Sequence, residues 1–159
     1  MTVPCFKLSA VGGTFDRFHI GHEVLLKTAF TLSETVIVGI TSSEMLRNKA
    51  LKERIQSFKE RFENVVSYLK RSGFIDKAVF YMLRDDYGPA LWIRRLEALF
   101  VSPETYPKAL ILNGLRAKQG LGKLVIVVIP TILAENGKPI SSTRIRGGLI
   151  RRDGSTIKL

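Results

Sequence analysis

The sequence predicts an α/β fold with a five-stranded, mainly parallel sheet and helices on both faces. Short apolar runs rich in β-branched residues recur along the chain, and amphipathic or capped helical stretches separate them. Strands that alternate with helices form βαβ units, whose right-handed crossovers place the helices on both faces of the sheet.

Five segments are expected to be strands. Residues 6–13 form an apolar run that ends in two glycines, and residues 35–41 are a continuous β-branched run of the kind found in buried parallel strands. The remaining strands are expected at residues 77–83, 98–102 and 123–130.

Helical signals lie between and after these strands. Residues 21–32 carry apolar side chains at helical spacing, and residues 58–69 repeat phenylalanine, valine and leucine at intervals of three and four. A third helix is expected from the Ser-Pro pair at 102–103 to Gly120. The serines of ISSTRIR begin the last one, which the following Gly-Gly pair should shorten or kink.

This order of elements predicts a single Rossmann-like, doubly wound domain over residues 1–159. Such sheets bind ligands at the carboxyl ends of their strands, where the strand order reverses. The glycine-rich sequence after the first strand is therefore the first candidate for a site.

Composition limits the class of protein and its partners. The formal net charge of +11 favours a polyanionic partner, either nucleic acid or a phosphate-rich small molecule. No apolar run approaches the roughly 20 residues of a membrane helix, and the start of the chain lacks the apolar region of a signal peptide. The one cysteine, Cys5, is expected to be a buried free thiol. Together these features predict a cytoplasmic protein.

The first strand runs into the sequence GGTFDRFHIGH, which contains the chain's only two histidines, His19 and His22. A metal site is disfavoured because no third ligand clusters with them, and a nucleophile is disfavoured because the turn has no serine or cysteine. Anion binding remains: Gly12, Gly13 and Gly21 let a phosphate approach the backbone and the helix start, where imidazoles can donate hydrogen bonds.

A second phosphate signal is ISSTRIR near the end of the chain. Ser141 or Ser142 can cap a helix, and the hydroxyls, including that of Thr143, can surround phosphate oxygens with an arginine. Because Arg144 and Arg146 are about 200° apart on a regular helix, only one is expected to face a ligand. Arg144 is the favoured one.

The pair of motifs GTFDxxHxGH and ISSTxxR resembles the nucleotidyltransferases of the HIGH superfamily. Between them lie RNKAL, DDYGPA, VSPETY and ILNGLR, in that order. These extend the resemblance over nearly the whole chain, to the phosphopantetheine adenylyltransferases of the archaeal and eukaryotic type.

The resemblance implies transfer of the adenylyl group of ATP to 4′-phosphopantetheine, with dephospho-coenzyme A and pyrophosphate as products, in coenzyme A biosynthesis. The acceptor phosphate would attack the α-phosphorus in line with no covalent intermediate, so the protein would supply positioning and charge stabilisation. Magnesium is expected to enter with ATP, held mostly by phosphates and water, because no dedicated carboxylate cage is visible.

The resemblance also implies residue roles. His22 would stabilise the transition state, and His19 would contact the nucleotide phosphates. Lys49 in RNKAL would be a mobile phosphate-binding lysine, with Lys52 as the alternative.

Other contacts follow from the same resemblance. Thr14 and Phe15 would lie where the two substrates meet, and ISSTR would hold the β- and γ-phosphates. The candidates for adenine, ribose or acceptor contacts are Ser102, Glu104, Thr105, Asn113, Arg116 and Asp86.

Two other interpretations stay open. A related nucleotidyltransferase would share the chemistry but act on nicotinamide mononucleotide, flavin mononucleotide or glycerol 3-phosphate. A basic nucleic-acid-binding module would use the +11 charge, but it would need neither phosphate motif, and the chain has no aromatic-rich basic strand or recognition helix. The expected partners are therefore ATP and phosphopantetheine, with no nucleic acid and no membrane, and the sequence indicates no oligomeric state.

Overall fold

A parallel sheet forms the centre of the computed structural model, which describes residues 3–158. Its strands lie in the order β3-β2-β1-β4-β5, and every neighbouring pair is parallel. The α/β prediction is thus confirmed, with a wholly parallel sheet in place of a mainly parallel one. The strands are β1 (Phe6–Gly13), β2 (Ser33–Thr41), β3 (Ala78–Leu83), β4 (Ala98–Val101) and β5 (Val125–Val128).

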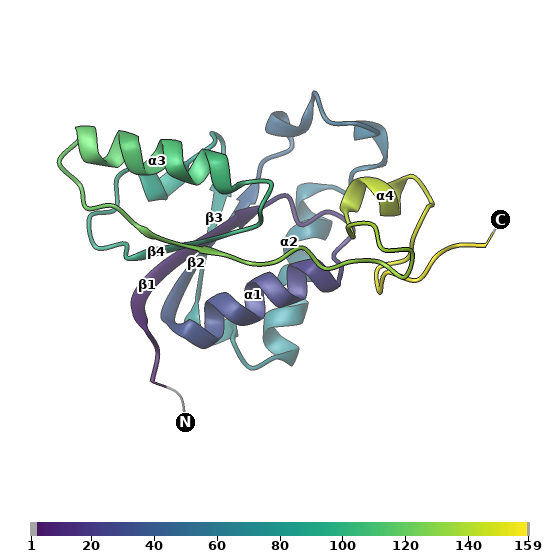
Figure 1. Cartoon of the computed structure of the whole chain (residues 1–159), viewed down its shortest axis with the longest axis horizontal. Helices are drawn as coiled ribbons and strands as arrows, with labels where there is room; N and C mark the ends of the chain where they lie inside the picture. The colour runs from purple at the N-terminus through teal and green to yellow at the C-terminus, as the bar shows by residue number, and fades with distance from the viewer. Residues whose placement is uncertain (1–2, 159) are drawn as a thin grey trace.

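Helices cover both faces of the sheet, as expected for a doubly wound fold. In Figure 1, α1 and α2 lie on one side of the sheet and α3 lies on the other, together with the 3₁₀ turn η4. The helices are α1 (Ile20–Leu32), α2 (Phe58–Arg71), α3 (Tyr106–Lys118) and α4 (Ser142–Arg146), and the short turns are η1 (Glu44–Leu46), η2 (Lys52–Arg54), η3 (Ile75–Lys77) and η4 (Gly88–Leu91).

Alternating side chains on the central strands build two apolar cores. Val11 of β1 packs with α1 and α2, whereas Leu8 and Ala10 pack with η4 and α3. The continuous apolar run of β2 follows from the same burial, because this strand is covered on both faces. Cys5, just before β1, is exposed, so the expectation of a buried thiol is wrong. No helix within residues 3–158 has the length and apolar character needed to span a bilayer.

The strand order reverses beside β1. The chain moves outward from β1 through β2 to β3 on one side, and from β4 to β5 on the other. The carboxyl end of β1, at Gly13, therefore opens at the switch point where such sheets bind ligands. The short helix α4 lies near the start of α1 (Figure 1), where the amide of Ile20 donates to the carbonyl of Arg152.

Leu83, the last residue of β3, lies across the glycines at this end of the sheet. A Cβ on Gly39 would stand 2.9 Å from Cγ of Leu83, and one on Gly12 would stand 3.3 Å from its Cδ1. Gly88 also faces Leu83 and has a φ of 51°, in the left-handed region that favours glycine. Because these glycines have no side chains, Leu83 can pack directly against the backbone, which leaves space above the strand ends.

Replacing Gly39 by alanine should destabilise the fold by about 1–3 kcal/mol, because the methyl group overpacks against Leu83. The matched control is Gly114→Ala in α3, where a Cβ meets nothing within 4 Å. That change should stabilise the protein by about 0.5–1 kcal/mol through helix propensity. Thermal or urea unfolding measures both, and equal stability of the two variants would contradict the packing argument.

Candidate active site

A cavity of about 510 Å³ opens at the carboxyl ends of β1, β2 and β4. This volume is in the range that holds small-molecule ligands. The cavity wall includes these residues singled out from the sequence: Gly12, Gly13, Thr14, Phe15, His19, Gly21, His22, Lys49, Asp86, Ser102, Glu104, Thr105, Ser141, Ser142 and Thr143.

The two histidines form a reciprocal cap at the start of α1. Nδ1 of His19 accepts from the amide of Gly21 at 3.1 Å, and Nδ1 of His22 accepts from the amide of His19 at 3.3 Å. Their rings stack with centroids 3.7 Å apart. A Cβ on Gly21 would stand 2.9 Å from Cε1 of His19, so this glycine makes room for an imidazole as well as opening the helix start.

The cap also fixes the chemical form of both rings. A nitrogen that accepts a hydrogen bond carries no proton, so each neutral ring holds its proton on Nε2 and can donate it to a ligand. Burial lowers the pKa of His19 to about 4, although Asp16 acts in the opposite direction. Burial, His19 and Lys49 hold the pKa of His22 well below its ordinary value. The site therefore presents two neutral N–H donors at physiological pH.

Lys49 supplies a cation next to this pair. Its Nζ donates to Oγ1 of Thr14 at 2.9 Å, which brings the segment after η1 onto the histidine motif. Burial lowers the pKa of Lys49, and Arg146 lowers it further. Lys52 begins η2 and is absent from the cavity wall, so Lys49 is the lysine that the structure places at the site.

Arg146, and not Arg144, faces the cavity. The Arg146 side chain is buried and its Nη1 donates to Oδ2 of Asp16 at 2.8 Å. Arg144 turns outward, where its guanidinium donates to the carbonyl of Pro139 at 2.7 Å. The choice of Arg144 as the ligand contact is thus corrected. The two arginines point in different directions, as expected, but Arg146 is the one that faces the cavity. It occupies the arginine position of the pattern ISSTxxR.

Two further candidates serve the fold instead of the cavity. Arg116 is buried and donates to the carbonyls of Ala90, Ile93 and Gly122, which ties α3 to η4. The Asn113 amide exchanges two hydrogen bonds with the backbone of Leu124. Neither lies on the cavity wall, so their expected nucleotide or acceptor contacts are not supported.

The carboxylates at the rim have separate tasks. Oδ1 of Asp85 accepts from the amides of Tyr87 and Gly88 and shapes the loop. Asp86 forms an ion pair with Lys108 of α3, with 2.9 Å between Oδ1 and Nζ. No three His, Cys, Asp or Glu side chains within the described residues gather as a metal site.

Two buried residues were missed from the sequence. Asp16 is fully buried and accepts from both Arg146 and the amide of Gln56. Arg61 is also fully buried and donates to the carbonyls of Thr14 and Thr41, each at 2.8 Å. Arg61 occupies a position of the apolar stripe of α2, three residues after Phe58, and a charge on such a stripe is the signal that could have identified it.

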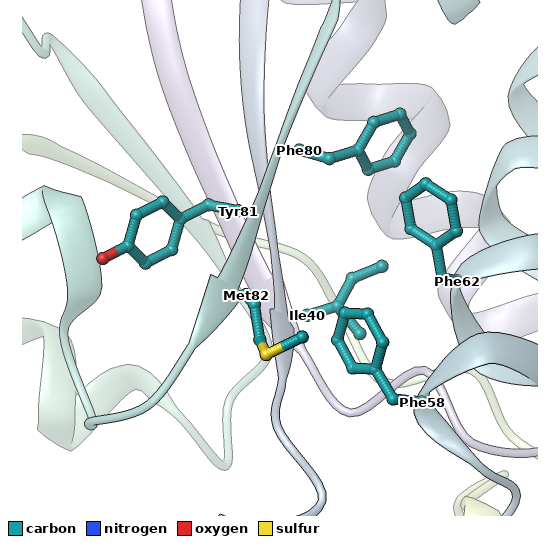
Figure 2. Close-up of a pocket in the computed structure, with 6 residues that line it drawn as sticks. All are labelled: Ile40, Phe58, Phe62, Phe80, Tyr81 and Met82. Atoms are coloured by element: carbon teal, nitrogen blue, oxygen red, sulfur yellow. The ribbon is translucent and has the colours of Figure 1, made fainter.

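A smaller hollow of about 180 Å³ lies between α2 and β3, away from these groups. Figure 2 shows phenylalanines, Ile40 and Met82 around it, while the hydroxyl of Tyr81 points to the other side of the strand. Because no polar groups converge there, the chemistry of the molecule is concentrated in the larger cavity.

Comparison with known proteins agrees with this geometry. The cytidylyltransferase-like family matches residues 10–148. A phosphopantetheine adenylyltransferase from Pyrococcus abyssi is 41% identical over 153 residues, covering 96% of this chain and 97% of the relative. One from Methanothermobacter thermautotrophicus is 43% identical over 156 residues, covering 96% and 91%. The crystal structure of a protein of unknown function from Archaeoglobus fulgidus is 30% identical with a TM-score of 0.68, covering 96% and 100%.

The neutral histidines predict a specific NMR titration. The ring signal of His19 should stay constant from pH 8 down to about 5, since its pKa lies at about 4. The signal of His22 should also stay constant there, and His22→Gln assigns the two. A signal that titrates near the ordinary value of 6.5 would contradict the buried cap.

The same shift links the cap to stability. From pH 6.5 down to about 4 the unfolded chain takes up a proton that the folded His19 refuses, so the free energy of unfolding should fall over that window. Inorganic triphosphate should raise both pKa values, because its negative charge favours the imidazolium form.

Proposed function

Because this chain belongs to the phosphopantetheine adenylyltransferases of the cytidylyltransferase-like family, we propose that it transfers the adenylyl group of ATP to 4′-phosphopantetheine. The products are dephospho-coenzyme A and pyrophosphate. One observation carries the proposal: two imidazole donors, a lysine and a buried arginine converge at the strand switch point, in a cavity of the size that binds small molecules.

The histidines act on the α-phosphate as neutral donors. Their Nε2–H groups are free of the cap that uses Nδ1, and donors fixed in advance stabilise the charge that develops during in-line attack. His22, whose ring packs beside Phe15 and Phe18, serves the reacting phosphorus. His19, at the helix cap, holds the nucleotide.

The cations meet the negative charge of the polyphosphate. Lys49 reaches the cavity from the exposed segment after η1, so it can move with the leaving pyrophosphate. Arg146 and the hydroxyls of ISSTRIR lie on the wall beyond it, where the β- and γ-phosphates are held. The attacking phosphate is already anionic near pH 7, so the reaction needs positioning more than a base.

Magnesium is proposed to arrive with ATP. The carboxylates on the cavity wall are Asp85, Asp86 and Glu104, and among the described residues they do not gather with one another or with a histidine as a metal site, which suits an ion carried by phosphates and water. Its charge would offset that of the polyphosphate.

An apolar wall favours phosphopantetheine over a second nucleotide as the acceptor. Ile37, Leu83, Ala90, Leu99 and Leu112 line the side of the cavity toward η4 and α3. These side chains suit a flexible aliphatic chain. The nucleic-acid alternative is weakened because Arg61, Arg116 and Arg146, three of the chain's cations, are buried against their own protein.

Pyrophosphate release from ATP, measured with each acceptor in parallel, tests the proposal. Turnover is expected with 4′-phosphopantetheine and not with nicotinamide mononucleotide, flavin mononucleotide or glycerol 3-phosphate. Turnover with one of the other acceptors and none with phosphopantetheine would overturn the assignment of substrate.

Two lysine variants connect this activity to the cavity. Lys49→Ala should lower kcat by about 10²–10³-fold, because it removes a cation that acts on transferred charge. Lys52→Ala, three residues later and off the cavity wall, is the matched control and should keep the parent rate. Equal effects of the two changes would place the reaction elsewhere.

A further inference from the structure

Asp16 lies within the histidine turn, buried behind the cavity wall, and the chemistry proposed above does not use it. Its side chain is fully buried. Oδ1 accepts from the amide of Gln56 at 2.8 Å, and Oδ2 accepts from Nη1 of Arg146 at 2.8 Å. Its main-chain oxygen accepts from Oγ of Ser142 at 2.6 Å. One residue thus joins the histidine turn, the segment after η2 and the start of α4.

Arg146 extends these contacts to the segment that holds Lys49. Nη2 of Arg146 donates to the carbonyl of Ala50 at 3.1 Å, directly after Lys49. Nη1 of Arg54 donates back to the carbonyl of Arg146 at 3.2 Å. Arg17, next to Asp16, closes the loop with a bond of 2.8 Å from Nη2 to the carbonyl of Arg54.

The backbone beside these contacts is strained. Phe15 and Arg17, on either side of Asp16, have φ values of 54° and 49°, and Leu51, directly after Ala50, has a φ of 53°. Side chains of this size seldom adopt the left-handed region, which persists only where surrounding contacts enforce it. Each of the three is adjacent in sequence to Asp16 or Ala50, which take part in the hydrogen bonds described above. These hydrogen bonds, here called the Asp16 network, therefore hold the backbone in this conformation.

We propose that Asp16 is a positioning residue that holds the histidine turn, Lys49 and α4 together as one binding site for the ATP phosphates. It acts through Arg146 and touches no substrate itself. The proposal rests on the proposed function only in taking ATP as the ligand. Because the apolar acceptor wall is built by side chains of the strands, η4 and α3 that take no part in these hydrogen bonds, the effect of Asp16 should be confined to the nucleotide.

Asp16→Asn is the direct test. Asparagine keeps the size of the side chain and can still accept from Gln56, but it cannot balance the charge of Arg146. The KM for ATP should rise by about tenfold or more, because small displacements of binding groups have large effects. The KM for 4′-phosphopantetheine should stay within about twofold of the parent value, since no acceptor contact depends on this network.

Labelling of Lys49 gives a readout that does not depend on turnover. An amine-reactive acetyl ester labels Lys49, and mass spectrometry of its peptide gives the rate with and without magnesium-ATP. In the parent protein ATP should slow labelling of Lys49. In Asp16→Asn that protection should be lost, because Lys49 no longer sits against Thr14.

Arg54→Ala tests the same network from outside the cavity. It removes the bond to the Arg146 carbonyl and should raise the KM for ATP by about two- to fivefold. Lys59→Ala on α2 is the matched control. It also removes one positive charge, and it breaks an exposed pair with Glu63, so its kinetics should match the parent.

The outcomes separate the possibilities. An Asp16→Asn protein that melts earlier but keeps the parent KM for ATP and the parent labelling of Lys49 would make Asp16 purely structural and overturn the proposal. An equal rise in both KM values would also overturn it. If Asp16→Asn fails to fold, an unchanged KM for ATP in Arg54→Ala would overturn the proposal instead. A parent protein without turnover on phosphopantetheine refutes the function, while ATP protection of Lys49 still tests the network.

Discussion

The buried ion pair between Asp16 and Arg146 is the interaction on which the geometry of the site depends. Its two side chains are 0% and 2% exposed, so each charge relies on the other and on backbone partners. Removing one partner of such a pair costs about 3–5 kcal/mol, a large share of the 5–15 kcal/mol that stabilises a typical domain. The helix α4 has only five residues and is too short to be stable alone. It is also held by the hydrogen bonds of Ser142 and Arg146 described above, and by Ile145, which packs against a small apolar cluster of Ala134, Ile140 and Ile150.

The site separates charge from hydrogen-bond donation. Burial keeps both stacked imidazoles neutral by lowering their pKa values, Lys49 adds to this at His22, and the cap on Nδ1 directs their protons to Nε2. Positive charge comes instead from Lys49 and Arg146. A bound triphosphate would supply the negative charge that complements these cations. The two Nε2–H groups are fixed in place before the reaction, so their hydrogen bonds to the phosphate oxygens can strengthen as charge develops, without the loss of a solvent shell. This division explains why two histidines occupy one glycine-rich turn.

The sequence predicted the sheet, the position of the site and most of its wall, because these depend on strand periodicity and on short motifs at strand ends. It failed where a side chain's direction depends on a distant partner. The rotation of α4 about its axis is set by Asp16, about 130 residues earlier in the chain. Its ion pair holds Arg146 on the buried side of the helix and leaves Arg144 on the exposed side. Arg116 shares a helical stripe with Leu112 and Ala109, so burial against η4 outweighed the role that the resemblance suggested. Asp16 itself was overlooked because a carboxylate in a turn is ordinarily solvated.

Hydrogen–deuterium exchange with and without magnesium-ATP tests the central claim that one buried pair joins three distant segments into a single nucleotide site. The amides of residues 12–22, 47–56 and 140–146 should gain protection together on addition of ATP, while β5 and α3 should stay unchanged. Protection confined to one of the three segments, or centred on α3, would contradict the account.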